Sequence, residues 1–87
     1  MVSPVHPVAE GVSVTLGCKL KTENALSIVH FYKNGKLVQN DTRRELLISE
    51  VSKSDEGFYK CGEHDSLRPW QSFMSRESWL SVKREYD

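Results

Sequence analysis

Apolar and polar residues alternate along most of the chain, which is the pattern of a β-strand with one buried face. Residues 12–20 place five apolar side chains on one face: Val12, Val14, Leu16, Cys18 and Leu20. Residues 28–32 predict a second strand, in which Val29 and Phe31 are the inward pair. The spacing is not that of an amphipathic helix, so both segments predict strands.

An Asn-Gly pair separates residues 28–32 from the next strand-like run. Asn34 and Gly35 suit the positive φ angles that a two-residue hairpin turn needs. The pair therefore predicts a hairpin whose second, short strand begins at Leu37 and Val38.

The inward pattern continues through Leu46, Ile48 and Val51 and is then interrupted. Ser52 is followed three residues later by Asp55, which is the spacing of a capping box. We therefore expect a single helical turn at this point, where the chain would connect two sheets.

The last two predicted strands cover residues 57–61 and 79–83. Their inward positions are Tyr59, Cys61, Leu80 and Val82. Pro4 and Pro7 suit an N-terminal edge strand, because proline cannot donate to a ladder. Short strands at intervals of about 8–12 residues predict an antiparallel β-sandwich.

Cys18 and Cys61 are the only two cysteines in a chain of 87 residues. If they are joined, the closed loop of about 44 residues contributes about 4 kcal/mol in the chain-entropy model. A persistent disulfide implies an oxidising compartment. A metal-binding or redox role for the pair is the alternative, but it lacks support from a Cys-x-x-Cys motif or a second cysteine pair.

The charges argue against a nucleic-acid partner. Twelve basic and twelve acidic residues cancel, and no basic stripe could neutralise many phosphates. No run of about 20 apolar residues suggests a membrane span. Met1 directly before a strand-like run is typical of an expression start on an excised domain, so we expect a larger parent protein.

The residues around the two cysteines resemble the immunoglobulin superfamily across essentially the whole chain. Val14-x-Leu16-x-Cys18 is similar to strand B of that fold. Strands E and F are matched by Leu46-x-Ile48-x-x-Val51-x-x-x-Asp55-x-Gly57-x-Tyr59-x-Cys61. The resemblance implies an all-β, immunoglobulin-like antiparallel sandwich of the C2-like or I-like set, with one disulfide between its sheets.

The same resemblance implies structural roles for three further residues. Tyr59 would anchor the corner before Cys61, and Phe31 would cover the disulfide where the family usually has tryptophan. The Asp55 carboxylate would satisfy backbone donors or pair with a base such as Arg43 or Arg44.

Two segments have a narrower resemblance, to Fc-receptor-like and related leukocyte receptors. Residues 31–38 (FYKNGKLV) are similar to strands C to C′, and residues 77–82 (ESWLSV) to the strand G ending of fish members, including leukocyte immune-type receptors. This resemblance implies that residues 1–87 form one extracellular domain of a multidomain, membrane-anchored immune receptor. Its protein partner would be an immunoglobulin, a major histocompatibility molecule or another surface protein.

Residues 62–76 are the part of the chain that the folding pattern explains least. We expect a long loop there, and such loops are usually functional or mobile. Arg68, Trp70 and Phe73 are candidate contacts for a partner, because tryptophan and arginine are enriched among binding hot spots. Packing of these side chains over the sandwich end is the alternative. Tyr32, facing outward on the neighbouring sheet, is a weaker candidate.

Other candidate chemistry is sparse. Asn40-Asp41-Thr42 is a sequon in an expected surface loop, so Asn40 is a candidate N-glycan acceptor unless the sequon is unused. His64 between Glu63 and Asp65 could suggest a metal, but consecutive residues point in different directions. No nucleophile elbow or phosphate-binding loop is present, so we expect no enzyme activity, cofactor or metal.

These features favour a ligand-binding or spacer domain at the cell surface or in a secreted protein. The alternative is a structural module of an adhesion protein or an intracellular filament. An intracellular module would keep Cys18 and Cys61 as thiols and leave Asn40 bare.

Overall fold

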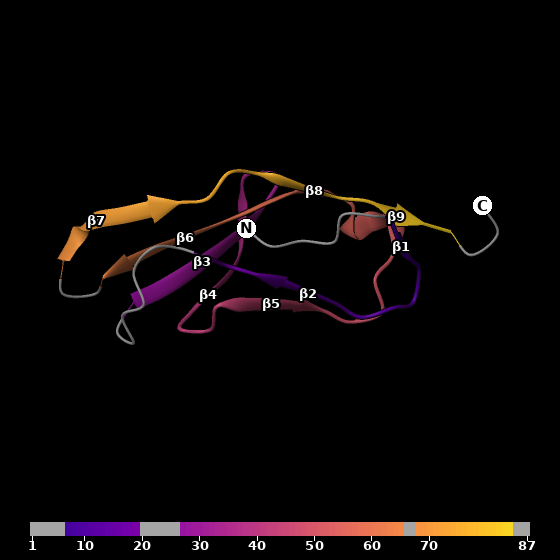
Figure 1. The fold of residues 1–87 in the computed structure, drawn as a ribbon, viewed down its shortest axis with the longest axis horizontal. Coiled ribbons are helices and arrows are strands. Elements are labelled where there is room, and N and C mark those ends of the chain that lie inside the picture. The colour runs from indigo at the N-terminus through magenta and orange to yellow at the C-terminus, as the bar shows by residue number, and fades with distance from the viewer. Residues whose placement is uncertain (1–6, 20–26, 66–67, 85–87) are drawn as a thin grey trace.

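The larger of the two layers is a five-stranded antiparallel sheet (Figure 1). The computed structural model describes residues 7–19, 27–65 and 68–84. Four strands lie side by side in the order β4 (Lys36–Asp41), β3 (Ser27–Lys33), β6 (Gly57–Asp65) and β7 (Arg68–Met74). The short β8 (Ser78–Leu80) pairs with the beginning of β6.

Two pairs of short strands complete the fold. β2 (Val14–Gly17) pairs antiparallel with β5 (Glu45–Ile48), and β1 (Val8–Ala9) pairs parallel with β9 (Val82–Lys83). The β2–β5 pair forms the layer opposite the large sheet (Figure 1). Only residues 42–44 separate β4 from β5, so there is no room for the extra strands of a nine-stranded variable domain. The all-β sandwich predicted from the alternation is confirmed, although the β1–β9 pair is parallel.

The core lies between the layers and contains most of the predicted inward positions. Its buried residues are Val14, Leu16, Cys18, Val29, Phe31, Leu46, Val51, Tyr59, Cys61, Leu80 and Val82. Val12 was expected on this face but is 50% exposed. The reason is that β2 begins only at Val14, whereas Val12 accepts a backbone hydrogen bond from Val51 in a loop. Leu20 and Pro4 lie outside the described residues.

The predicted hairpin turn between β3 and β4 is confirmed. Asn34 and Gly35 both have positive φ, 50° and 83°, as the sequence pair suggests. The Asn34 Oδ1 atom also accepts a hydrogen bond from the backbone N–H of Phe58 at 3.0 Å. The turn is thereby tied to the start of β6, and the strand expected to begin at Leu37 and Val38 is β4, which runs on to Asp41.

The long loop predicted over residues 62–76 is wrong, because most of that segment is strand. β6 continues past Cys61 to Asp65, and β7 returns antiparallel to it. Along this extension β6 also pairs with β3, from Gly62 opposite His30 to Asp65 opposite Ser27. Backbone hydrogen bonds to β3 and to β7 therefore hold this part of β6 in a strand, although its apolar and polar residues do not alternate.

Residues 75–77 separate β7 from β8, and Ser75 is bonded to Cys61 on β6. The backbone N–H of Ser75 donates to the carbonyl of Cys61 at 2.7 Å, and its Oγ accepts from the Cys61 N–H at 2.8 Å. The chain then continues as β8 and β9, so the predicted last strand is present in two pieces. The predicted helical turn is the 3-10 turn η1 (Lys53–Asp55).

Candidate functional site

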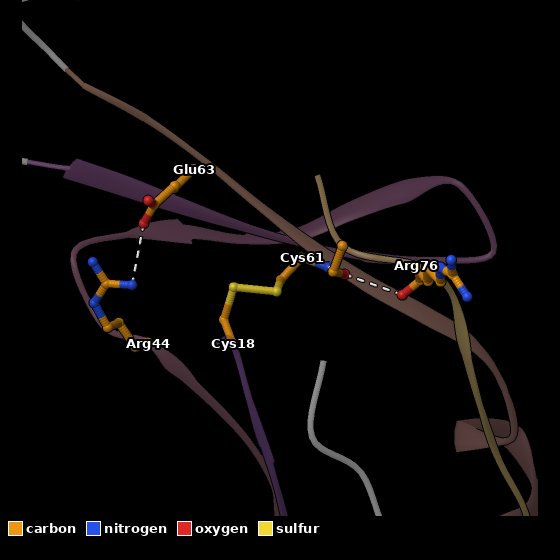
Figure 2. The surroundings of a disulfide bond; sticks show 6 residues. Cys18, Arg44, Cys61, Glu63 and Arg76 are labelled. Carbon is orange, nitrogen blue, oxygen red and sulfur yellow. Dashed lines mark hydrogen bonds and ion pairs between the residues drawn. A yellow bond between two sulfur atoms is a disulfide. The ribbon is translucent and has the colours of Figure 1, made fainter. Parts of the chain in front are cut away.

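The disulfide between Cys18 and Cys61 joins the two layers (Figure 2). The Cα atoms are 5.9 Å apart, and both residues are buried. Phe31 lies opposite Cys61 in the β3–β6 register and is fully buried. A phenylalanine thus lies opposite Cys61, where the resemblance noted in the sequence implies a cover for the disulfide.

Tyr59 forms the corner that its motif suggests. Its hydroxyl donates to the backbone carbonyl of Asp55 at 2.6 Å. Burial and, to a smaller extent, the nearby Asp55 charge raise the pKa of Tyr59 to about 12. The phenol is therefore a structural donor that stays protonated at neutral pH.

The Asp55 carboxylate satisfies local donors instead of pairing with a base. Its Oδ2 accepts from the backbone N–H of Ser52 at 2.8 Å. Arg43 pairs with Asp41, and Arg44 lies beside Glu63. Of the two alternatives considered for Asp55, the structure shows the first.

A buried charge lies next to the disulfide and was not expected from the sequence. Glu63 is 2% exposed, and its Oε2 is 3.1 Å from Nη1 of Arg44 (Figure 2). Glu63 shares the inner face of β6 with Tyr59 and Cys61, because side chains two residues apart face the same way. That spacing was the signal that could have placed it inside.

The outer face of the large sheet carries Tyr32, one of the predicted contact residues. Tyr32 lies opposite Lys60 in the β3–β6 register, and the Lys60 ammonium is 5.6 Å from the centre of its ring. On the same face His30 and His64 bring their rings together, with Nε2 and Nδ1 separated by 2.6 Å.

An aromatic pair extends this face toward η1. Phe58 and Trp79 meet edge to face with ring centres 4.8 Å apart, and each is 49% exposed. Met74, opposite Gly62 in the β6–β7 register, is also exposed. The outer face thus exposes large apolar side chains that do not belong to the core.

The three remaining candidate contacts lie on β7. Arg68 and Trp70 belong to its first half, and their side chains lie outside the described part of the structure. Phe73 lies opposite Glu63, on the inner side of the sheet, and is 42% exposed. Phe73 and Tyr32 therefore face opposite sides of the sheet and do not form one patch.

Asn40 is exposed, but it lies within β4 and not in the surface loop that was expected. β4 is the edge strand at the far side of the sheet from β7. Asp41, the middle residue of the sequon, is held by Arg43 through an ion pair of 3.0 Å. The side chain of Asn40 is accessible on the open edge of the sheet.

The histidine, cysteine and carboxylate side chains of residues 7–19, 27–65 and 68–84 include no group of three that could hold a metal ion. Glu63 and His64 face opposite sides of β6, as adjacent strand residues do. In the same ranges, no helix is long and apolar enough to span a membrane.

Solved structures with the same fold come from distant animals. The second Ig-C2 domain of human Fc-receptor like A has a TM-score of 0.77 and 23% identity over 88% of this chain and 85% of that one. The V domain of amphioxus IgVJ-C2 has a TM-score of 0.72 and 23% identity over 88% of this chain and 98% of that one. Drosophila OTK extracellular domains 3–5 have a TM-score of 0.68 and 20% identity over 92% of this chain and 34% of that one.

At these identities the three structures show a shared fold only. They come from human, amphioxus and Drosophila, so they lend no support to a fish origin or to a leukocyte receptor type. No curated protein matches the sequence.

The model of the immunoglobulin domain family matches residues 1–64, which include the disulfide and the tyrosine corner. The likeness to solved structures extends over most of the chain and agrees with that match. The chain belongs to the immunoglobulin domain family.

Proposed function

We propose that this domain binds a protein ligand on the extracellular side of a cell-surface immune receptor. Its disulfide suits an oxidising compartment. The resemblance of residues 31–38 and 77–82 to Fc-receptor-like receptors supports a receptor, and it suggests an immunoglobulin, a major histocompatibility molecule or another surface protein as the partner. The domain acts by surface complementarity, and neighbouring immunoglobulin domains complete the parent chain.

The observation that carries this proposal is the outer face of the five-stranded sheet, which no element of the described residues covers. The opposing layer packs on the inner face, whereas the outer face exposes the Phe58–Trp79 pair and Met74. Tyr32 and Lys60 add aromatic area and a charge beside them. Aromatic residues and methionine surrounded by polar groups are typical of protein interfaces.

The β6–β7 hairpin supplies a second set of contacts at one end of the sheet. Arg68 and Trp70 lie on β7, which is an edge strand of that sheet. A partner that approaches from the β7 edge could reach the hairpin and the outer face together. Asn40 lies on the opposite edge and opposite His30 in the β3–β4 register, so an N-glycan there would leave only the β7 side of the outer face open.

The two tryptophans of the chain provide a matched test of these contacts. The oxidised domain is screened against immunoglobulins and a panel of cell-surface ectodomains, and affinities are then compared for Trp70→Ala and Trp79→Ala. Trp70→Ala should weaken binding by more than about 2 kcal/mol if Trp70 is a hot spot. Unchanged affinity in a folded Trp70→Ala variant contradicts the hairpin assignment, and unchanged affinity in both variants contradicts the whole surface.

Expression through a secretory pathway tests the Asn40 site. We expect a mass decrease on treatment with a glycosidase that removes N-glycans, and no such decrease for Asn40→Gln. A wild-type mass equal to that of the bare chain would show that the sequon is unused.

The second candidate is a spacer in a multidomain adhesion protein. Its support is the likeness to a Drosophila structure that holds three extracellular domains. A spacer would show no ligand in the screen, although its disulfide would still form. Two free thiols under denaturing, non-reducing conditions would instead indicate an intracellular module and contradict both extracellular functions.

A further inference from the structure

Two histidines from different strands meet on the outer face of the large sheet. His30 lies on β3 and His64 on β6, 34 residues apart in the sequence. His30 Nε2 and His64 Nδ1 are 2.6 Å apart, and the rings lie nearly parallel, with centres 4.7 Å apart and an angle of 21°. The two imidazoles therefore share one N–H···N hydrogen bond.

The surroundings of His30 decide which ring donates. A neutral imidazole carries one N–H, and the other nitrogen is an acceptor. His30 Nδ1 is buried and has no hydrogen-bond partner among the described residues. A buried N–H without a partner is rarer in proteins than an unused acceptor. The geometry thus favours a proton on His30 Nε2, donated to His64 Nδ1.

Adding a proton to this neutral pair is unfavourable on either ring. A proton on His64 Nδ1 places two donors face to face, unless His30 moves its own proton to the buried Nδ1. A proton on His30 Nδ1 makes that ring a cation, and its new N–H has no acceptor among the described residues. Burial, and to a smaller extent the charge of His64, lower the pKa of His30.

Among the described side chains, the neighbouring groups on this face do not compensate an added positive charge. The ring of Tyr32 on β3 lies 6.3 Å from that of His30 between centres, and Lys60 on β6 lies over Tyr32. In the register, β4 places Asn40 opposite His30, and β7 places Ser72 opposite His64. Met74, also on β7, is uncharged, and the Glu63 carboxylate faces the inner side.

We propose that His30 and His64 form a proton-sensitive bridge between β3 and β6 that is closed near pH 7 and opens in mild acid. On opening, the outer face gains positive charge beside Lys60 and loses a contact between its two central strands. The proposal concerns the free domain and does not depend on the identity of a partner.

A metal ion is the competing ligand for two facing imidazoles, and the structure argues against it. Coordination through His30 Nε2 would move the proton of that ring to the buried Nδ1. Metal-bound histidines usually donate this N–H to a partner, and none is described here. No third ligand accompanies the pair among the residues described.

Nuclear magnetic resonance of ¹⁵N-labelled protein tests the protonation state directly. At pH 7.5 we expect His30 to show a protonated Nε2 and a bare Nδ1. On acidification, the His30 midpoint should lie below that of the urea-denatured chain, which is about 6.5. A His30 midpoint at or above the denatured value would overturn the proposal. A rise in the midpoint of thermal unfolding with added Zn²⁺, abolished by His64→Ala, would overturn it too.

A double-mutant cycle with His30→Ala and His64→Ala tests the bridge itself, because the cycle cancels what each substitution changes alone. At pH 7.5 the coupling should amount to about a fivefold factor in the unfolding equilibrium constant, as for one hydrogen bond. At pH 5.0 this factor should fall to near one. A coupling that is absent at pH 7.5, or equal at both pH values, would contradict a proton-sensitive bridge.

Discussion

The two faces of strand β6 differ sharply in exposure. On the inner face, Tyr59, Cys61 and Glu63 are each no more than 2% exposed. On the outer face, Phe58 is 49% exposed, although it is next to Tyr59 in the sequence. The difference arises because β2 and β5 form a layer over the inner face, whereas no described element covers the outer one.

This contrast separates the stabilising contacts of β6 from its exposed surface. A disulfide and an ion pair join the inner residues to the other layer, and a tyrosine hydrogen bond joins them to η1. On the outer face, Phe58 packs against Trp79 of the same sheet. Removing the links between the layers should therefore destabilise the domain more than substitutions on the outer face.

The largest loss should follow removal of the disulfide. The double variant Cys18→Ala/Cys61→Ala should lower the free energy of unfolding by about 4 kcal/mol, because the unfolded chain is no longer cross-linked. Urea denaturation of the oxidised wild type and the variant measures this difference. A loss below about 1 kcal/mol would show that the inner face does not depend on its covalent link.

The next largest loss should follow disruption of the buried ion pair. Arg44→Met should cost about 3 kcal/mol at pH 7, since it leaves the Glu63 carboxylate buried without its cation. The double variant Arg44→Met/Glu63→Leu should recover most of this loss, because both charges are then removed. If the double variant is less stable than Arg44→Met, the penalty does not come from the isolated carboxylate.

Tyr59→Phe should lower stability by about 1 kcal/mol through the lost hydrogen bond to Asp55. The pH dependence of stability tests the role of Tyr59 more specifically. Because the folded pKa of about 12 lies above the usual value of about 10, the folded state holds a proton that the unfolded state loses as the pH rises past 10. The wild type should therefore lose stability above pH 10, and Tyr59→Phe should lose less. Parallel pH profiles for the two proteins would contradict the raised pKa.

Substitutions on the outer face should cost no more than Tyr59→Phe and far less than Arg44→Met. Phe58→Ala and Trp79→Ala should each cost about 1 kcal/mol, since they remove one half-exposed partner of an aromatic pair. Chemical denaturation measures this cost, and circular dichroism confirms that the variants remain folded. A cost as large as that of Arg44→Met would end the distinction between the two faces.

The sequence alone predicted the inner face well. Burial imposes a strict alternation on short strands, so Leu16, Val29 and Phe31 could be placed without coordinates. The Asn34-Gly35 turn was equally accessible, because few residue pairs adopt two positive φ angles. Val12 shows where the alternation fails, at a position just before a strand begins.

The strand extension beyond Cys61 could not be predicted in the same way. Gly62 and Glu63 interrupt the apolar pattern, and their strand conformation depends on pairing with β3 and β7. Such pairing is a long-range effect that local propensity does not report. The same is true of the Arg44–Glu63 and His30–His64 pairs, whose partners are distant in the sequence.

The parallel pairing of β1 with β9 has a mechanical consequence. The backbone N–H groups of Val8 and Glu10 donate to the carbonyls of Ser81 and Lys83, each at 3.0 Å. Tension applied through the residues before β1 and after β9 pulls these two parallel strands in opposite directions along their length. Both hydrogen bonds then carry the load at the same time, in shear, before force reaches the disulfide-linked core.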